Sequence, residues 1–109
     1  MKLTELRELL DAETIQGESS NSDIACAYTS DLLSDVLAHA SPGCALITIQ
    51  AHRNAVAVAS VVGAAAIVIC NSRPIPDDMA EAAKNEGIAL FRTSENQFEV
   101  SGRIWSALH

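Results

Sequence analysis

The sequence predicts an α/β domain with a mostly parallel sheet built from alternating strands and helices, and three observations support this fold class. From residue 44 onward, short apolar runs alternate with segments that have helical spacing. Nearly continuous apolar runs are typical of parallel strands that are buried on both faces. Apolar residues make up 49% of the 109 residues and charged residues 19%, which is enough for one packed core. We therefore expect a single domain over residues 1–109, with right-handed βαβ crossovers.

The first part of the chain predicts one helix and two short strands. Leucines on one face indicate an amphipathic helix from Glu5 to Leu10, with Thr4 as its N-cap. Residues 12–15 and 24–28 have the pattern of short strands, and residues 16–22 are expected to form a polar loop between them.

A second helix is expected directly after the second strand. Thr29, Ser30 or Asp31 is its expected N-cap, and the helix ends near Ala40, before a Ser-Pro-Gly sequence. Helical spacing predicts that four apolar side chains face inward: Leu32, Leu33, Val36 and Leu37.

The rest of the chain predicts three strands that alternate with three helices. The expected strands are residues 44–49, 64–70 and 88–91, and the expected helices are residues 54–63, 76–86 and 95–108. Gly63 is expected to end the first of these helices, and Pro76 with two acidic residues to begin the second. The expected N-cap of the last helix is Thr93 or Ser94. Its expected core residues are Phe98, Ile104, Trp105 and Leu108.

The helix over residues 54–63 has an unusual composition. Its alternating Ala and Val residues also fit a strand, but a helix provides the crossover that its two neighbouring strands need. From Ala55 to Val62 it carries no charge, and Ser60 is its one polar residue. Because a helix that is apolar all round is usually buried all round, either another element or a second copy covers it. We expect a homodimer through or near Ala55–Val62; alternatively, small alanine side chains simply tolerate exposure.

Charge and cysteine content exclude several classes of protein. Fourteen acidic residues against seven Lys or Arg give a net charge of −7, whereas nucleic-acid and membrane-surface binders are usually basic. No apolar run is long enough for a membrane span, and the N-terminus does not have the pattern of a signal peptide. The three cysteines form no CxxC pair, which favours buried free thiols in a reducing compartment. We expect a cytoplasmic protein.

Polar residues follow three of the predicted parallel strands, and ligands favour that edge of a sheet. The three segments contain Arg53, Arg73 and Arg92, and guanidinium groups beside helix N-termini favour a small anion such as a nucleotide. The expected ligand-binding residues are Gln50, His52, Arg53, Asn54, Arg73, Arg92 and Thr93. Alternatively, these residues are polar only because loops contact water and because they cap helices. No glycine-rich phosphate loop is present.

The sequence contains no recognisable catalytic or metal-binding pattern. His52 lies where a general base could act, but no nucleophile motif accompanies it. The three histidines lack the spacing of metal ligands. Asp31 and Asp35 are four residues apart on one helical face and could form a carboxylate pair, but capping and solvation explain them more simply. We therefore expect no enzymatic activity, no metal and no cofactor.

Two stretches resemble the DRTGG domain family: YTSDLLSDVL at residues 28–37 and LITIQAHRNAVAVA at residues 46–59. The similarity extends to residues 63–69 and 86–90 and so covers nearly the whole chain. It implies an α/β domain similar to the N-terminal domain of HPr kinase/phosphorylase. Such domains also occur beside CBS domains in regulated pyrophosphatases, and their role is regarded as regulatory or dimer-forming, without chemistry of their own. The resemblance thus implies a stand-alone, single-domain member.

The chain departs from the motif that names the family. Asp23 is retained, but Ala25-Cys26-Ala27 stands where a Thr-Gly-Gly turn is expected, so a ligand site at that turn would be lost or altered. The segment with Gln50, His52 and Asn54 is intact. We expect a non-catalytic, homodimeric regulatory module that binds a small anionic ligand, a partner protein, or both. The alternative is a purely structural dimerisation or interaction domain without a ligand.

Overall fold

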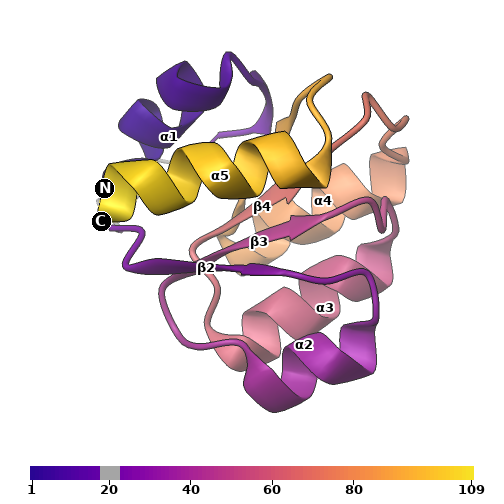
Figure 1. Ribbon diagram of the computed structural model, residues 1–109. Coiled ribbons are helices and arrows are strands. Elements are labelled where there is room, and N and C mark those ends of the chain that lie inside the picture. Colours follow the sequence, from indigo (N-terminus) through magenta and orange to yellow (C-terminus); the bar gives the residue numbers. More distant parts are fainter. Residues whose placement is uncertain (18–22) are drawn as a thin grey trace.

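The computed structural model describes residues 1–17 and 23–109 and contains one five-stranded sheet in the order β1-β5-β4-β3-β2 (Figure 1). Strands β2 to β5 are parallel to their neighbours, and β1 is antiparallel to β5. The strands are β1 (Glu13–Gln16), β2 (Cys26–Thr29), β3 (Cys44–Thr48), β4 (Ala66–Ile69) and β5 (Ala89–Arg92). The predicted mostly parallel sheet is confirmed; of the predicted polar loop, residues 18–22 lie outside the described residues.

Helices cover both faces of the sheet. One face carries α2 (Leu33–His39), α3 (Arg53–Val62) and α4 (Asp77–Glu86), and the other carries α1 (Leu3–Leu10) and α5 (Gln97–Leu108) (Figure 1). The crossovers from β2 to β5 each move one strand in the same direction, so their helices lie on one side of the sheet. Among the described residues, no helix has the length and apolarity needed to cross a membrane.

The central strands β3 and β4 are buried on both faces. Alternate residues of each strand join different cores: Ile47 and Val68 pack toward α1 and α5, whereas Leu46 and Ile67 pack toward α2, α3 and α4. Burial on both faces explains why these strands read as continuous apolar runs in the sequence.

The N-caps that we predicted for three helices are wrong. Helix α1 begins two residues earlier than predicted, at Leu3 after Lys2, so Thr4 lies inside it. Helix α2 follows Leu32 without a side-chain cap, and Asn96 caps α5. Asn96 is favoured because its side chain accepts a hydrogen bond from the Glu99 N–H and the Glu99 side chain accepts one from the Asn96 N–H, which satisfies both donors.

Four apolar residues predicted to face inward are exposed: Leu32, Leu37, Phe98 and Trp105. In α5 the buried side chains are Val100 and Ile104, four residues apart, and Phe98 and Trp105 lie off that line. In α2 Val36 is the buried residue, because this seven-residue helix covers only the edge of the sheet.

Neighbouring elements cover one side of α3. It packs between α2 and α4, and Ala55, Val56 and Ala59 are buried against them and the sheet. Ala57 and Val61 remain exposed, the latter to 74%. Cover by other elements therefore explains the buried side of this apolar helix, and a second copy on its exposed side stays a prediction.

Candidate functional site

The parallel strands bring their following loops to one side of the sheet, here called the carboxyl edge (residues 30–32, 49–52, 70–76 and 93–96). Thr48, Ile69 and Arg92 are aligned there in adjacent strands. The loops after β4 and β5 are also joined: the Asn71 N–H donates to the Glu95 carbonyl (3.0 Å) and the Ser72 N–H to the Thr93 carbonyl (2.9 Å). The expectation that these corners share one rim is confirmed.

The Asp31 carboxylate connects the loop after β2 to the end of β3 and to α5. Asp31 Oδ1 accepts hydrogen bonds from the Thr48 hydroxyl (2.9 Å), the Ile49 N–H (2.8 Å) and the Gln97 side-chain amide (3.0 Å). Asp31 therefore ties the end of β2 to the end of β3 and to the start of α5. Our interpretation of Asp31 as a helix cap was wrong, because its carboxylate bonds to other elements rather than to α2.

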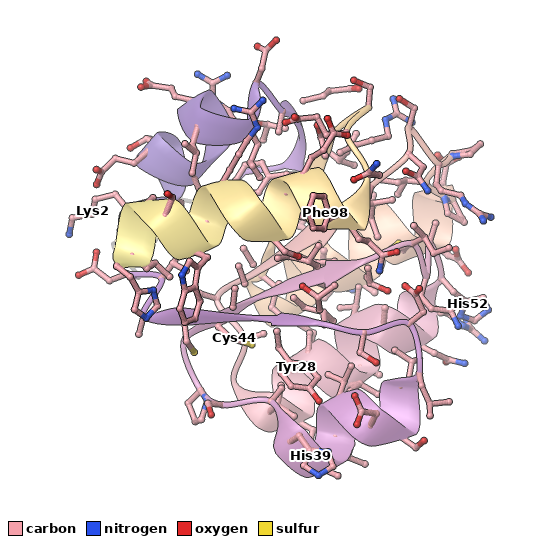
Figure 2. All side chains as sticks on the ribbon, viewed as in Figure 1. Lys2, Tyr28, His39, Cys44, His52 and Phe98 are labelled. Carbon is pink, nitrogen blue, oxygen red and sulfur yellow. The ribbon has the colours of Figure 1, made fainter. Side chains whose placement is uncertain are left out.

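His52 caps helix α3. Its Nδ1 accepts a hydrogen bond from the Asn54 N–H at 3.0 Å, which leaves Nε2 to carry the hydrogen of the neutral ring. Figure 2 shows the side chain at the carboxyl edge, on the outside of the molecule. Gln50, Arg53 and Asn54 are exposed beside it.

The three arginines of the predicted site have different surroundings. The Arg53 Nε lies 4.0 Å from Asp78 Oδ2, and both side chains are largely exposed. Arg73 is exposed in the loop after β4. Arg92, by contrast, donates from Nε (3.2 Å) and Nη2 (2.8 Å) to Glu13 of β1. The edge thus presents Arg53 and Arg73 together with two acidic residues at the start of α4, while Arg92 is paired at the neighbouring strand.

Thr93 is buried and serves the fold. Its hydroxyl donates to the Leu10 carbonyl (3.4 Å) and accepts from the Glu95 N–H (3.2 Å), so it joins the end of α1 to the loop after β5. Of the predicted site residues, the structure therefore presents Gln50, His52, Arg53, Asn54 and Arg73 to solvent and engages Arg92 and Thr93 in internal contacts.

Asp35 anchors α2 to the edge strand. It accepts a hydrogen bond from the Tyr28 hydroxyl (2.8 Å) and lies 3.1 Å from His39 Nδ1. The hydrogen bond from Tyr28, together with those from Ser30 and His39, lowers the pKa of Asp35, and the same bond raises the pKa of Tyr28. Figure 2 shows Tyr28 directed toward α2, where His39 lies. Asp31 and Asp35 thus have separate roles and do not form a carboxylate pair.

The segment Ala25-Cys26-Ala27 enters the edge strand β2 and is not a turn. The Ala25 N–H donates to the Gly43 carbonyl (3.0 Å), and Cys26 is half-buried. Cys44 and Cys70 are buried free thiols, and desolvation raises the pKa of each to about 11, so they are poor nucleophiles.

The comparisons with known proteins agree with this fold. The crystal structure of the CBS and DRTGG domains of the regulatory region of Clostridium perfringens pyrophosphatase, complexed with the activator diadenosine tetraphosphate, superimposes with a TM-score of 0.77 at 14% sequence identity. The match covers 94% of this chain and 45% of that one, so the chain spans less than half of the regulatory region. No curated protein matches the chain.

The family model described as DRTGG domain matches residues 5–107. That range contains all the strands of the sheet and the whole carboxyl edge. Since the match extends over nearly the whole length, the chain belongs to the DRTGG domain family.

Proposed function

We propose that this protein is a non-catalytic, cytoplasmic regulatory module that binds a small anionic ligand, such as a nucleotide, at the carboxyl edge. The observation that carries the proposal is the exposure of Arg53, the first residue of α3, and of Arg73, in the loop that follows the adjacent strand β4. Guanidinium groups bind phosphate and carboxylate through paired hydrogen bonds. The pyrophosphatase regulatory region, which contains CBS domains and a domain of this fold, forms a complex with a nucleotide activator, and this supports the choice of nucleotides as the ligand class to test.

The other residues of the proposed site have complementary roles. Gln50 and Asn54 supply exposed amide donors and acceptors on either side of His52. Arg92 and Thr93 hold β1, α1 and the loop after β5 in place, and so fix the rim on which a ligand rests.

Absence of catalysis is part of the proposal. His52 is the candidate base in these loops, and its Nδ1 already accepts the Asn54 N–H. A base in this position also needs a nucleophile within hydrogen-bond reach, and the His52 ring has no such partner among its hydrogen bonds to described residues.

A thermal-shift screen tests the ligand, using AMP, ATP, diadenosine tetraphosphate and inorganic phosphate as probes. A ligand that binds only the folded state stabilises it by about 2.7 kcal/mol at one hundred times its Kd, so at least one probe should raise the unfolding midpoint. Arg53→Gln and Arg73→Gln should each reduce that rise by more than half. Arg7→Gln, the same change at an exposed position of α1, is the matched control and should show the same rise in the unfolding midpoint as the wild type. Equal shifts in all variants, or none with any probe, would contradict the anion site.

The second candidate function is a structural dimerisation domain. It is favoured by exposed apolar side chains on one helical layer, namely Leu32, Leu37 and Val61. If a second copy covers α3, Val61→Glu should convert a dimer to a monomer in light scattering because it places a charge in the contact. Ser60→Glu is unsuitable as a control because the Ser60 hydroxyl donates to Glu86; Arg7→Glu on α1 serves instead. A wild-type mass equal to one chain rules out this dimer.

A further inference from the structure

A second candidate site lies between edge strand β2 and helix α5. A hollow of about 380 Å³ is lined by Ala27 and Thr29 of β2, by Ala25 just before this strand, and by Ser101, Ile104 and Trp105 of α5. It shares no lining residue with the proposed anion site at the carboxyl edge. Small-molecule sites have volumes of about 300–1,000 Å³, so the hollow has room for a single ring system.

The hollow exists because β2 presents small side chains to α5. Ala25, Ala27 and Thr29 occupy alternate positions and so share one face of the strand. Short side chains there leave the space between strand and helix unfilled, and Ala25 and Ala27 remain exposed. The buried side chains of Ile47 and Ile104 contribute an apolar surface.

An aromatic surface borders the hollow. The Trp105 indole is 66% exposed although it lines the hollow, and it stacks on the His109 ring with centroids 3.9 Å apart and planes 20° apart. The stack fixes the indole, and a fixed, exposed indole can stack against a second flat ring.

One polar pair lies among these apolar groups. The Thr29 and Ser101 hydroxyl oxygens are 2.7 Å apart, so one of them donates to the other. The acceptor hydroxyl keeps its own hydrogen to donate, and the donor keeps lone pairs. The pair thus offers a donor beside an acceptor, which complements the donor–acceptor edge of a nucleobase. Among the residues that the structure describes, the lining contains no Lys, Arg, Asp or Glu, and so it offers no side chain of these four types to pair with a charged ligand.

We propose that the hollow between β2 and α5 binds a neutral, planar heteroaromatic ring of nucleobase type. The ring lies beside the Trp105 indole and bonds through its polar edge to the Thr29–Ser101 pair. The hydroxyl pair distinguishes this occupant from an apolar segment of protein, which would leave the two polar groups without a complement.

Trp105 is the one tryptophan in the chain, so its indole N–H gives a single side-chain signal that reports on the hollow. The probe is adenosine, which carries the ring without phosphate, and ribose is the control. Adenosine should shift the indole signal saturably in two-dimensional NMR and release heat in calorimetry, whereas ribose should do neither. Arg53→Gln should leave adenosine binding unchanged, which separates this site from the anion site.

Two matched variants test the location. Ala27→Leu fills the hollow and should weaken adenosine binding at least tenfold, while Ala57→Leu, the same change on exposed α3, should leave it unaltered. Ser101→Ala removes half of the hydroxyl pair and should weaken adenosine binding severalfold without filling the hollow. This variant tests the location of the site if Ala27→Leu does not fold. Circular dichroism confirms that each variant is folded.

Three results would overturn the proposal. The first is no saturable shift with adenosine up to its solubility limit. The second is equal affinity in Ala27→Leu, Ser101→Ala and the wild type. The third is an indole signal that shifts with protein concentration in the absence of adenosine, together with a dimer that the Ala27→Leu substitution dissociates. That result would mean that a second copy of the chain occupies the hollow.

Discussion

The two edges of the sheet are built differently. At one edge, β1 runs antiparallel to β5, and an ion pair between Arg92 and Glu13 crosses the two strands. At the other edge, β2 carries no charged residue, and Leu37 and Trp105 are exposed on the helices at its two faces. Charged residues on an edge strand discourage pairing with other chains. The β1 edge is therefore protected from pairing with the strand of another chain, whereas the β2 edge and its hollow are open to a ligand or a partner.

The largest expected effect concerns the residue that ties the β2 edge to the rest of the sheet. Asp31→Ala removes the carboxylate that accepts three hydrogen bonds. Two of the donors, Thr48 and Ile49, are at the end of β3, and the third is Gln97. We expect a loss of about 2–4 kcal/mol in the free energy of unfolding, measured by urea denaturation. Glu8→Ala on exposed α1 is the control and should change stability by less than about 0.5 kcal/mol. A similar small loss for both would mean that the carboxylate does not hold the edge.

A pair of identical substitutions compares the open edge with the core. Ala27 of β2 and Ala45 of β3 are register partners on adjacent strands, but Ala27 is exposed and Ala45 is fully buried. Ala45→Leu should cost about 1–3 kcal/mol or more because the packed core has no room for three added carbons. Ala27→Leu should change the free energy of unfolding by less than about 0.5 kcal/mol. If both variants lose the same stability, β2 is as closely packed as β3 and no hollow exists in solution.

The smallest expected effect is the pH dependence of the contact between β2 and α2. Because hydrogen bonds lower the pKa of folded Asp35, its contribution to stability is complete above the ordinary value of 3.8 and is lost as the pH falls through the lower, folded value. Tyr28→Phe removes the largest cause and should raise the pKa of Asp35 toward 3.8, measured by NMR titration of its carboxyl carbon. No change in that pKa would show that Tyr28 and Asp35 are not bonded in solution.

The fold could be predicted because its signals are local. Continuous apolar runs identified β3 and β4, and Gly63 ends α3 as expected. Both Gly63 and Gly87, at the C-terminal ends of α3 and α4, have the left-handed conformation. The pairing of β1 with β5 could not be read from pattern, because it joins residues 79 apart. The sequence alone does not show that Glu13 pairs with Arg92. Arg92 was therefore predicted to be available for an anion.

The exposed and buried faces of the outer helices were harder to predict. Phe98 and Trp105 are apolar, but whether they are covered depends on how much of the sheet lies beneath α5, which spacing alone does not reveal. The hollow could not be predicted either, because it forms where α5 passes over an edge strand with small side chains, and the position of α5 over the sheet is not visible in the sequence. The best available signal was the alternation of Ala25, Ala27 and Thr29, which the sequence shows but which has meaning only once α5 is placed.

Helix α5 begins at Gln97, whose side-chain amide donates a hydrogen bond to the Asp31 carboxylate. About two turns later, Trp105 of the same helix lines the hollow. Eight residues of α-helix span roughly 12 Å and behave as a rod on that scale. One helix therefore supplies Gln97 to the hydrogen bonds of Asp31 and Trp105 to the hollow, so a rigid-body displacement of α5 would move both side chains together. Helix α5 is thus the element that the carboxyl edge and the hollow have in common.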